Sequence, residues 1–105
     1  ARAREAARRA GEASRAAAAE ARRQKRAADA RRRRIEDLET RIADREQAIR
    51  ELEASMAAPG FYDDHAAARP IIDRHQALMW EVGSLMSQWE VLQSDDSERP
   101  PSENS

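Results

Sequence analysis

The sequence predicts an all-α fold: an antiparallel two-helix coiled-coil hairpin, preceded by a basic helix or linker and followed by a disordered acidic tail. Two apolar heptad patterns of similar length predict the helices, and a Pro-Gly segment between them predicts the turn. The composition agrees, because 37% of the residues are charged and 4% are aromatic, as in long helices and coiled coils. We assign residues 1–31 to the linker, 32–93 to the hairpin and 94–105 to the tail.

The first helix of the hairpin is indicated by residues whose spacing alternates between three and four. In an α-helix this spacing places them on one stripe, the a and d positions of a heptad, which we call the first seam. Arg45 interrupts its apolar character. The first seam consists of Ile35, Leu38, Ile42, Arg45, Ile49, Leu52 and Met56.

The second helix carries a matching second seam, in which His75 is the polar position. Pro70 lacks an amide donor, so we expect it to bend this helix or to begin it. Antiparallel packing is expected to pair residues whose numbers add to about 124, such as Ile49 with His75 and Leu38 with Leu85. The second seam consists of Ile71, His75, Leu78, Val82, Leu85, Trp89 and Leu92.

The turn is expected at about residues 57–65, where Pro59 and Gly60 can stop the first helix. Asp63 or Asp64 can then cap the second helix. The tail, residues 94–105, is polar, acidic and contains two prolines, a composition typical of disordered segments.

The charge of the chain is divided between its two parts. Residues 1–34 carry thirteen Lys and Arg against four Asp and Glu, or +9, whereas residues 35–105 carry six against sixteen, or −10. Residues 1–34 contain no Leu, Ile, Val, Met or aromatic residue, so a helix there has nothing to bury and we expect partial fraying.

The densest basic stretch predicts contact with nucleic acid, because the forked guanidinium of arginine suits phosphate oxygens. Four consecutive arginines point in all directions around a helix, so we expect no reading of base sequence. A solvated helical linker is the alternative. The candidate nucleic-acid-binding residues are Arg22, Arg23, Lys25, Arg26, Arg31, Arg32, Arg33 and Arg34.

Catalysis and metal binding are not expected of this chain. Asp63, Asp64, His65 and His75 match no zinc or hydrolase spacing, and the sequence has no Gly-rich phosphate loop. It has no cysteine and no apolar run of the roughly 18 residues that a membrane span needs. We expect a cytoplasmic fragment of a larger protein, without a membrane partner or a small-molecule substrate.

Three segments resemble the C-terminal coiled-coil domain of ABC-F family ATP-binding cassette ATPases. They are Arg-Arg-Arg-Ile-Glu-Asp-Leu-Glu at 32–39, Ala-Ala-Pro-Gly-Phe-Tyr-Asp-Asp at 57–64 and Trp-Glu-Val-Leu at 89–92. The resemblance implies that Pro59, Tyr62 and Asp63 shape the turn and that Trp89 and Glu90 close the base of the hairpin. It also implies a parent ATPase, acting on ribosomes or nucleic acid, that binds ATP and Mg in domains outside this chain.

We therefore expect a non-catalytic binding arm that contacts DNA or ribosomal RNA through its basic segment. The alternative is a structural coiled coil that docks a protein partner or the parent's own ATPase domains. Trp89 lies on the second seam and is expected in the core, whereas Trp80 lies beside it and could cover the seam or meet a partner.

Overall fold

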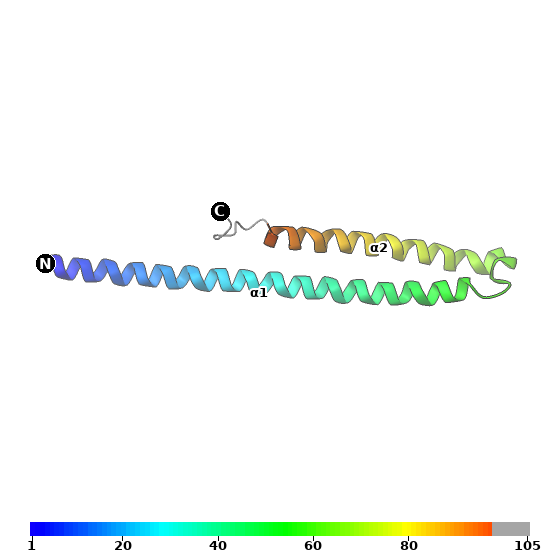
Figure 1. The fold of residues 1–105 in the computed structure, drawn as a ribbon, viewed down its shortest axis with the longest axis horizontal. Helices are drawn as coiled ribbons and strands as arrows, with labels where there is room; N and C mark the ends of the chain where they lie inside the picture. The colour runs from blue at the N-terminus through cyan, green and yellow to red at the C-terminus, as the bar shows by residue number, and fades with distance from the viewer. Residues whose placement is uncertain (98–105) are drawn as a thin grey trace. The chain divides into compact units, whose positions relative to one another are not determined.

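The structure, a computed structural model, describes residues 1–97, with side chains described through residue 95. Two α-helices, α1 (Arg2–Met56) and α2 (His65–Ser97), are joined through a short 3₁₀ helix, η1 (Phe61–Asp63). The chain divides into two compact units, Ala1–Arg34 and Ile35–Ser105. In the second unit α2 runs back along the part of α1 that belongs to it (Figure 1), so the all-α hairpin is confirmed.

The turn is built by the Pro-Gly pair. The carbonyl of Ala58 accepts a hydrogen bond from the amide of Phe61 at 3.2 Å. Between these residues lie Pro59 and Gly60, and Gly60 has φ 81° and ψ 3°. This is the geometry of a type II turn, which favours proline first and requires a positive φ, hence glycine, second. Pro59 and Gly60 thus end α1 because the type II turn that they form cannot continue a helix.

Asp64 caps α2. Its Oδ1 accepts a hydrogen bond from the amide of Ala67 at 3.2 Å, and its carbonyl accepts one from the amide of Ala68 at 2.9 Å. A carboxylate that binds the first free amides of a helix is a typical N-cap. Of the two aspartates expected to cap this helix, Asp64 does so, while Asp63 lies in η1.

Pro70 lies inside α2, which begins at His65, so the expectation that the helix could start at Pro70 is wrong. The Asp64 cap begins the helix earlier, and Pro70 removes only one amide donor from the following turn.

At the other end α2 continues to Ser97, so residues 94–97 are helical rather than part of a disordered tail. Residues 98–105, the rest of that predicted tail, lie outside the described residues.

Both seams lie between the helices of the second unit, because every one of their residues is buried or half-buried. Leu38 and Leu78 are each 2% exposed, and Ile49, Leu78 and Val82 form a central cluster against which Leu52 packs. Ala68 extends the core toward the turn. The heptad interpretation of residues 35–92 therefore locates the core.

The register between the helices differs from the expectation. Three of the side-chain pairs described between the helices have residue numbers that add to 126 or 128. Ile49 and Leu78, which share the central cluster, add to 127, so the expected value of about 124 is wrong. The crossing pairs are Arg45 with Glu81, Glu53 with His75, and Glu39 with Trp89, each at 3.0 Å.

The gaps along the seams explain the observed register. Each seam alternates gaps of three and four residues, and the helices run in opposite directions. The gaps match layer by layer only when an a position faces a d position, as Ile49 faces Leu78. The expected register placed Ile49 opposite His75, a against a, which would offset every second layer by one residue.

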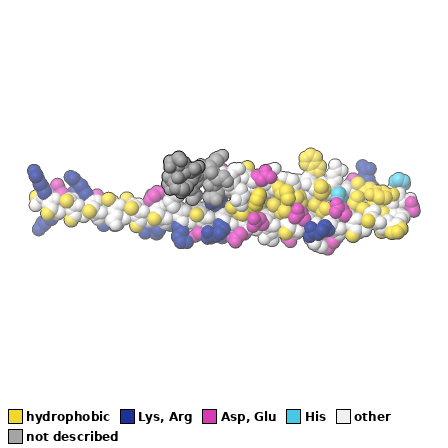
Figure 2. Space-filling model, in the orientation of Figure 1, with side chains coloured by type: hydrophobic (Ala, Val, Ile, Leu, Met, Phe, Trp, Pro, Cys, Tyr) yellow, Lys and Arg dark blue, Asp and Glu magenta, His cyan; other side chains and the backbone are white. Residues whose placement is uncertain are grey.

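The first unit is helical from Arg2, so the expected fraying is not observed in the structure. Almost all its side chains are exposed, and none is buried. Figure 2 shows basic side chains projecting from this unit, while larger hydrophobic ones gather over the second unit. Intrinsic helix propensity of Ala and Arg, with ion pairs three or four residues apart, stabilises such a helix without a core. No described helix is long and apolar enough to cross a membrane.

Candidate nucleic-acid interface

The eight candidate residues all lie on α1, within the first unit. Seven of them are exposed and Arg31 is half-buried. Because the segment between Arg22 and Arg34 is helical throughout, these cations leave the helix in different directions rather than on one face. The structure therefore brings them together along the chain but does not converge them on one point.

Two carboxylates bind three of the eight candidate residues, namely Arg23, Lys25 and Arg32. Glu20 accepts hydrogen bonds from Arg23 Nη2 at 2.6 Å and from Gln24 Nε2 at 2.9 Å. Asp29 accepts one from Lys25 Nζ at 3.0 Å and one from Arg32 Nη2 at 2.6 Å.

These bonds favour the charged carboxylates. The hydrogen bonds from Arg23, then from Gln24, lower the pKa of Glu20, and those from Lys25, then from Arg32, lower the pKa of Asp29. Both carboxylates therefore stay ionised and keep their partners partly neutralised.

Four other candidates have no such partner. Among the residues that the structure describes, no hydrogen bond or ion pair holds Arg22, Arg26, Arg33 or Arg34. Their guanidinium groups are exposed and always charged, so they can bind phosphate oxygens without breaking an internal bond. The structure thus divides the predicted site into a paired and an unpaired group, which the sequence did not separate.

The residues expected to shape the turn and those expected to close the base lie at opposite ends of the hairpin. Pro59 occupies the type II turn, and the Tyr62 ring lies edge-on to Phe61 with centroids 4.8 Å apart. Trp89 Nε1 donates to Glu39 Oε2 at 3.0 Å, which links the helices, whereas Glu90 is exposed and lines a groove beside Trp89.

The His and Asp residues considered for metal binding do not converge. Asp63, Asp64 and His65 are exposed around the turn, whereas His75 contacts Glu53 through Nε2. Across residues 1–97, no three His, Cys, Asp or Glu side chains gather in a way that could hold a metal ion.

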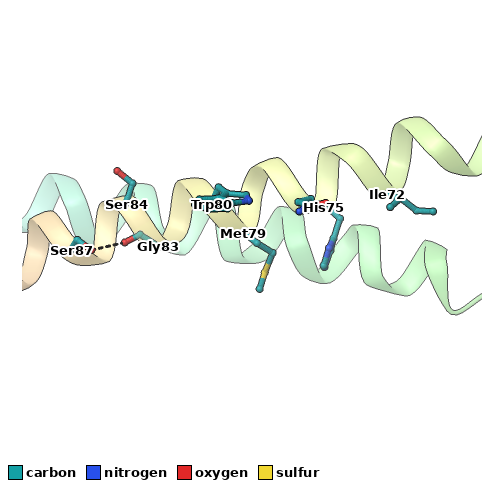
Figure 3. Close-up of a pocket in the computed structure, with 8 residues that line it drawn as sticks. Ile72, His75, Met79, Trp80, Gly83, Ser84 and Ser87 are labelled. Atoms are coloured by element: carbon teal, nitrogen blue, oxygen red, sulfur yellow. Dashed lines mark hydrogen bonds between the residues drawn. The ribbon is translucent and has the colours of Figure 1, made fainter.

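A groove on α2 is a feature that the sequence reasoning missed. It encloses about 680 Å³ and is lined by Ile72, His75, Met79, Trp80 and Gly83, among others (Figure 3). Trp80 is 75% exposed, so it does not cover the seam. The spacing of Ile72, Met79 and Gly83 along one side of α2 could have revealed this second apolar strip.

Comparison with known proteins decides the family. Residues 26–94 match the family described as ABC transporter C-terminal domain. The chain belongs to this family. The match includes both helices of the hairpin and the four-arginine run, while residues 1–25 lie outside it.

One curated relative of this ABC C-terminal domain is a different kind of protein. The chain is 40% identical over 67 residues to peptide chain release factor 2 from Lactiplantibacillus plantarum. The matched part is 54% of this chain and only 17% of the release factor. No solved structure matches.

Proposed function

We propose that the chain is the non-catalytic binding arm of an ABC-F type ATPase, in the cytoplasm, and that it contacts DNA or ribosomal RNA through its basic segment. ATP and Mg would be bound by the parent's ATPase domains. One observation carries the proposal: Arg22, Arg26, Arg33 and Arg34 are exposed and lack partners among the described residues, and the ABC C-terminal domain match begins at residue 26.

The similarity to a peptide chain release factor supports the ribosomal side of this proposal. The shared segment covers 54% of this chain but only 17% of the release factor. A short segment that is similar in proteins of two kinds suits a docking element better than a catalytic domain.

The test measures the binding of labelled RNA and DNA duplexes by fluorescence anisotropy over a series of salt concentrations. Changing Arg22, Arg26, Arg33 and Arg34 to Gln should weaken binding and lower the slope of log affinity against log salt by about 3 to 4. Gln preserves helix propensity, so circular dichroism should be unchanged.

The hairpin offers a matched control with the same change in charge. Arg41, Arg50, Arg69 and Arg74 are also exposed, and changing these four to Gln should leave the salt slope unaltered. Equal losses in both variants would show that net charge alone attracts the nucleic acid, and the basic segment would then not be the site.

The groove on α2 favours a second candidate function, docking of the parent's own ATPase domains. Trp80 and Met79 are an exposed aromatic and a flexible apolar side chain beside Gly83. Side chains of these kinds are enriched in protein interfaces. Calorimetric titration of separately expressed ATPase domains should then give binding that Trp80→Ala abolishes. Binding unaffected by that change would exclude the groove as the docking surface.

A further inference from the structure

A line of arginines extends well beyond the eight candidate residues. Starting at Arg4, the steps are four, seven, seven, four and seven residues, and each step returns to nearly the same side of a helix. At 3.6 residues per turn the six side chains fall within about 40° of one another, over a length of roughly 44 Å. We call this set the arginine stripe: Arg4, Arg8, Arg15, Arg22, Arg26 and Arg33.

The acidic residues of the first unit leave the stripe largely uncompensated. Glu5 pairs with Arg9 at 3.9 Å, and Glu20 pairs with Arg23, both off the stripe. Asp29 lies next to the stripe, but its carboxylate is bound by Lys25 and Arg32, away from it. Within the described part of the chain only Arg8 has an acidic partner among the six, Glu12 at 3.9 Å.

All six stripe residues are exposed, and small residues on the same side leave room for them. A Cβ added at Gly11 would lie 3.4 Å from Arg15 Nη1, so the Arg15 guanidinium lies over this glycine. The stripe is therefore an open line of charge along the helix.

We propose, on the basis of the proposed function, that the arginine stripe binds the phosphate backbone of a double-stranded nucleic acid, with Arg4, Arg8 and Arg15 extending the site beyond the basic block. A double helix carries closely and regularly spaced phosphates along its whole length, so a straight row of guanidinium groups lying along it can meet phosphates of both strands. Single-stranded sites use aromatic stacking, and residues 1–34 contain no aromatic residue. Without Leu, Ile, Val or Met they also lack the apolar face that a membrane-surface helix inserts.

The decisive variant moves three arginines and changes neither composition nor net charge. Arg4→Ala with Ala6→Arg, Arg8→Ala with Ala10→Arg, and Arg15→Ala with Ala13→Arg place these cations on the opposite side of the helix from Arg22, Arg26 and Arg33. None of the three new positions has an acidic residue three or four positions away. Circular dichroism should show the same helix content as in the original chain.

Binding is measured by anisotropy with a labelled 24-base-pair DNA duplex, the same duplex as RNA, and the single strands. For both duplexes the rearranged variant should lose about three phosphate contacts, so that the salt slope falls by about 2 to 3. Changing Arg2 and Arg9, which lie off the stripe, to Gln should leave the slope close to its original value.

An unchanged slope in the rearranged variant, with binding still lost when Arg22, Arg26, Arg33 and Arg34 become Gln, would overturn the stripe and leave the proposed function standing. Equal losses on single strands and duplexes would also overturn the assignment to a double helix. Absence of binding by the original chain to every probe would overturn both.

Discussion

Gly60 and Gly83 show how one residue type can have opposite effects at two positions. Gly60 has φ 81°, and a Cβ there would lie 3.3 Å from Asp63 Oδ2, whereas a Cβ on Gly83 would meet nothing within 4 Å. Gly60→Ala should therefore destabilise the hairpin by about 1 to 2 kcal/mol. Gly83→Ala, inside a helix, should stabilise it by about 0.5 to 1 kcal/mol. Thermal unfolding followed by circular dichroism compares the two, and equal shifts would contradict the type II turn.

The hydrogen bonds of Glu20 and Asp29 predict that the helix content of the first unit depends on pH. Their hydrogen-bonded partners lower the pKa of each carboxyl from the ordinary values of 4.5 and 3.8. The stabilisation is thus present above these ordinary values and is lost as the pH falls through the lowered ones. Carbon chemical shifts around both residues should report less helix as the pH falls through the lowered pKa values. In a chain with Glu20→Gln and Asp29→Asn this acid-dependent loss should disappear.

Within the hairpin, the buried layers decide stability. Leu38 is 2% exposed, so Leu38→Ala should cost about 2 to 5 kcal/mol and unfold much of so small a core. Met79 is 52% exposed, and Met79→Ala should have little effect. A chemical denaturation series measures both, and similar midpoints would mean that the seam is not the core.

Arg45 is a polar residue in an apolar seam. Its Nε lies 3.0 Å from Glu81 Oε1, with the side chains 35% and 43% exposed, so the pair contributes at most about 1 kcal/mol. A leucine there would be buried against Val82 and should contribute more, so Arg45→Leu should stabilise the hairpin by about 1 kcal/mol. Glu81→Gln, which removes only the ion pair, is the control. A lower melting temperature for Arg45→Leu would show that the ion pair matters more than burial.

The elements could be predicted because each rests on a local signal. The heptad gaps identified both seams, and Pro59 with Gly60 identified the turn. The register does not follow from either seam alone, because it depends on how the gaps of the two seams match across the helices; Ile49 shares the central cluster with Leu78 rather than with His75. The ion pairs of Glu20 and Asp29 depend on rotamers, which the sequence leaves open, so the unpaired arginines could not be singled out.

The molecule combines a helix without a core and a hairpin with one. The first unit has no buried residue, while the second contains both seams and the three pairs that link Arg45 with Glu81, Glu53 with His75 and Glu39 with Trp89. Since stability arises from burial and nucleic-acid contact from exposed charge, the two properties should reside in different units.

Removing residues 1–34 tests this separation. The remaining chain keeps every seam layer, so its melting temperature should stay within a few degrees of the original. Its charge changes from −1 to −10, and it loses every unpaired arginine of the basic segment, so duplex binding should disappear at all salt concentrations. Circular dichroism and anisotropy on the same preparation measure the two properties together. Retained binding would place the contact on the hairpin, and a large loss of stability would show that residues 1–34 support the seams.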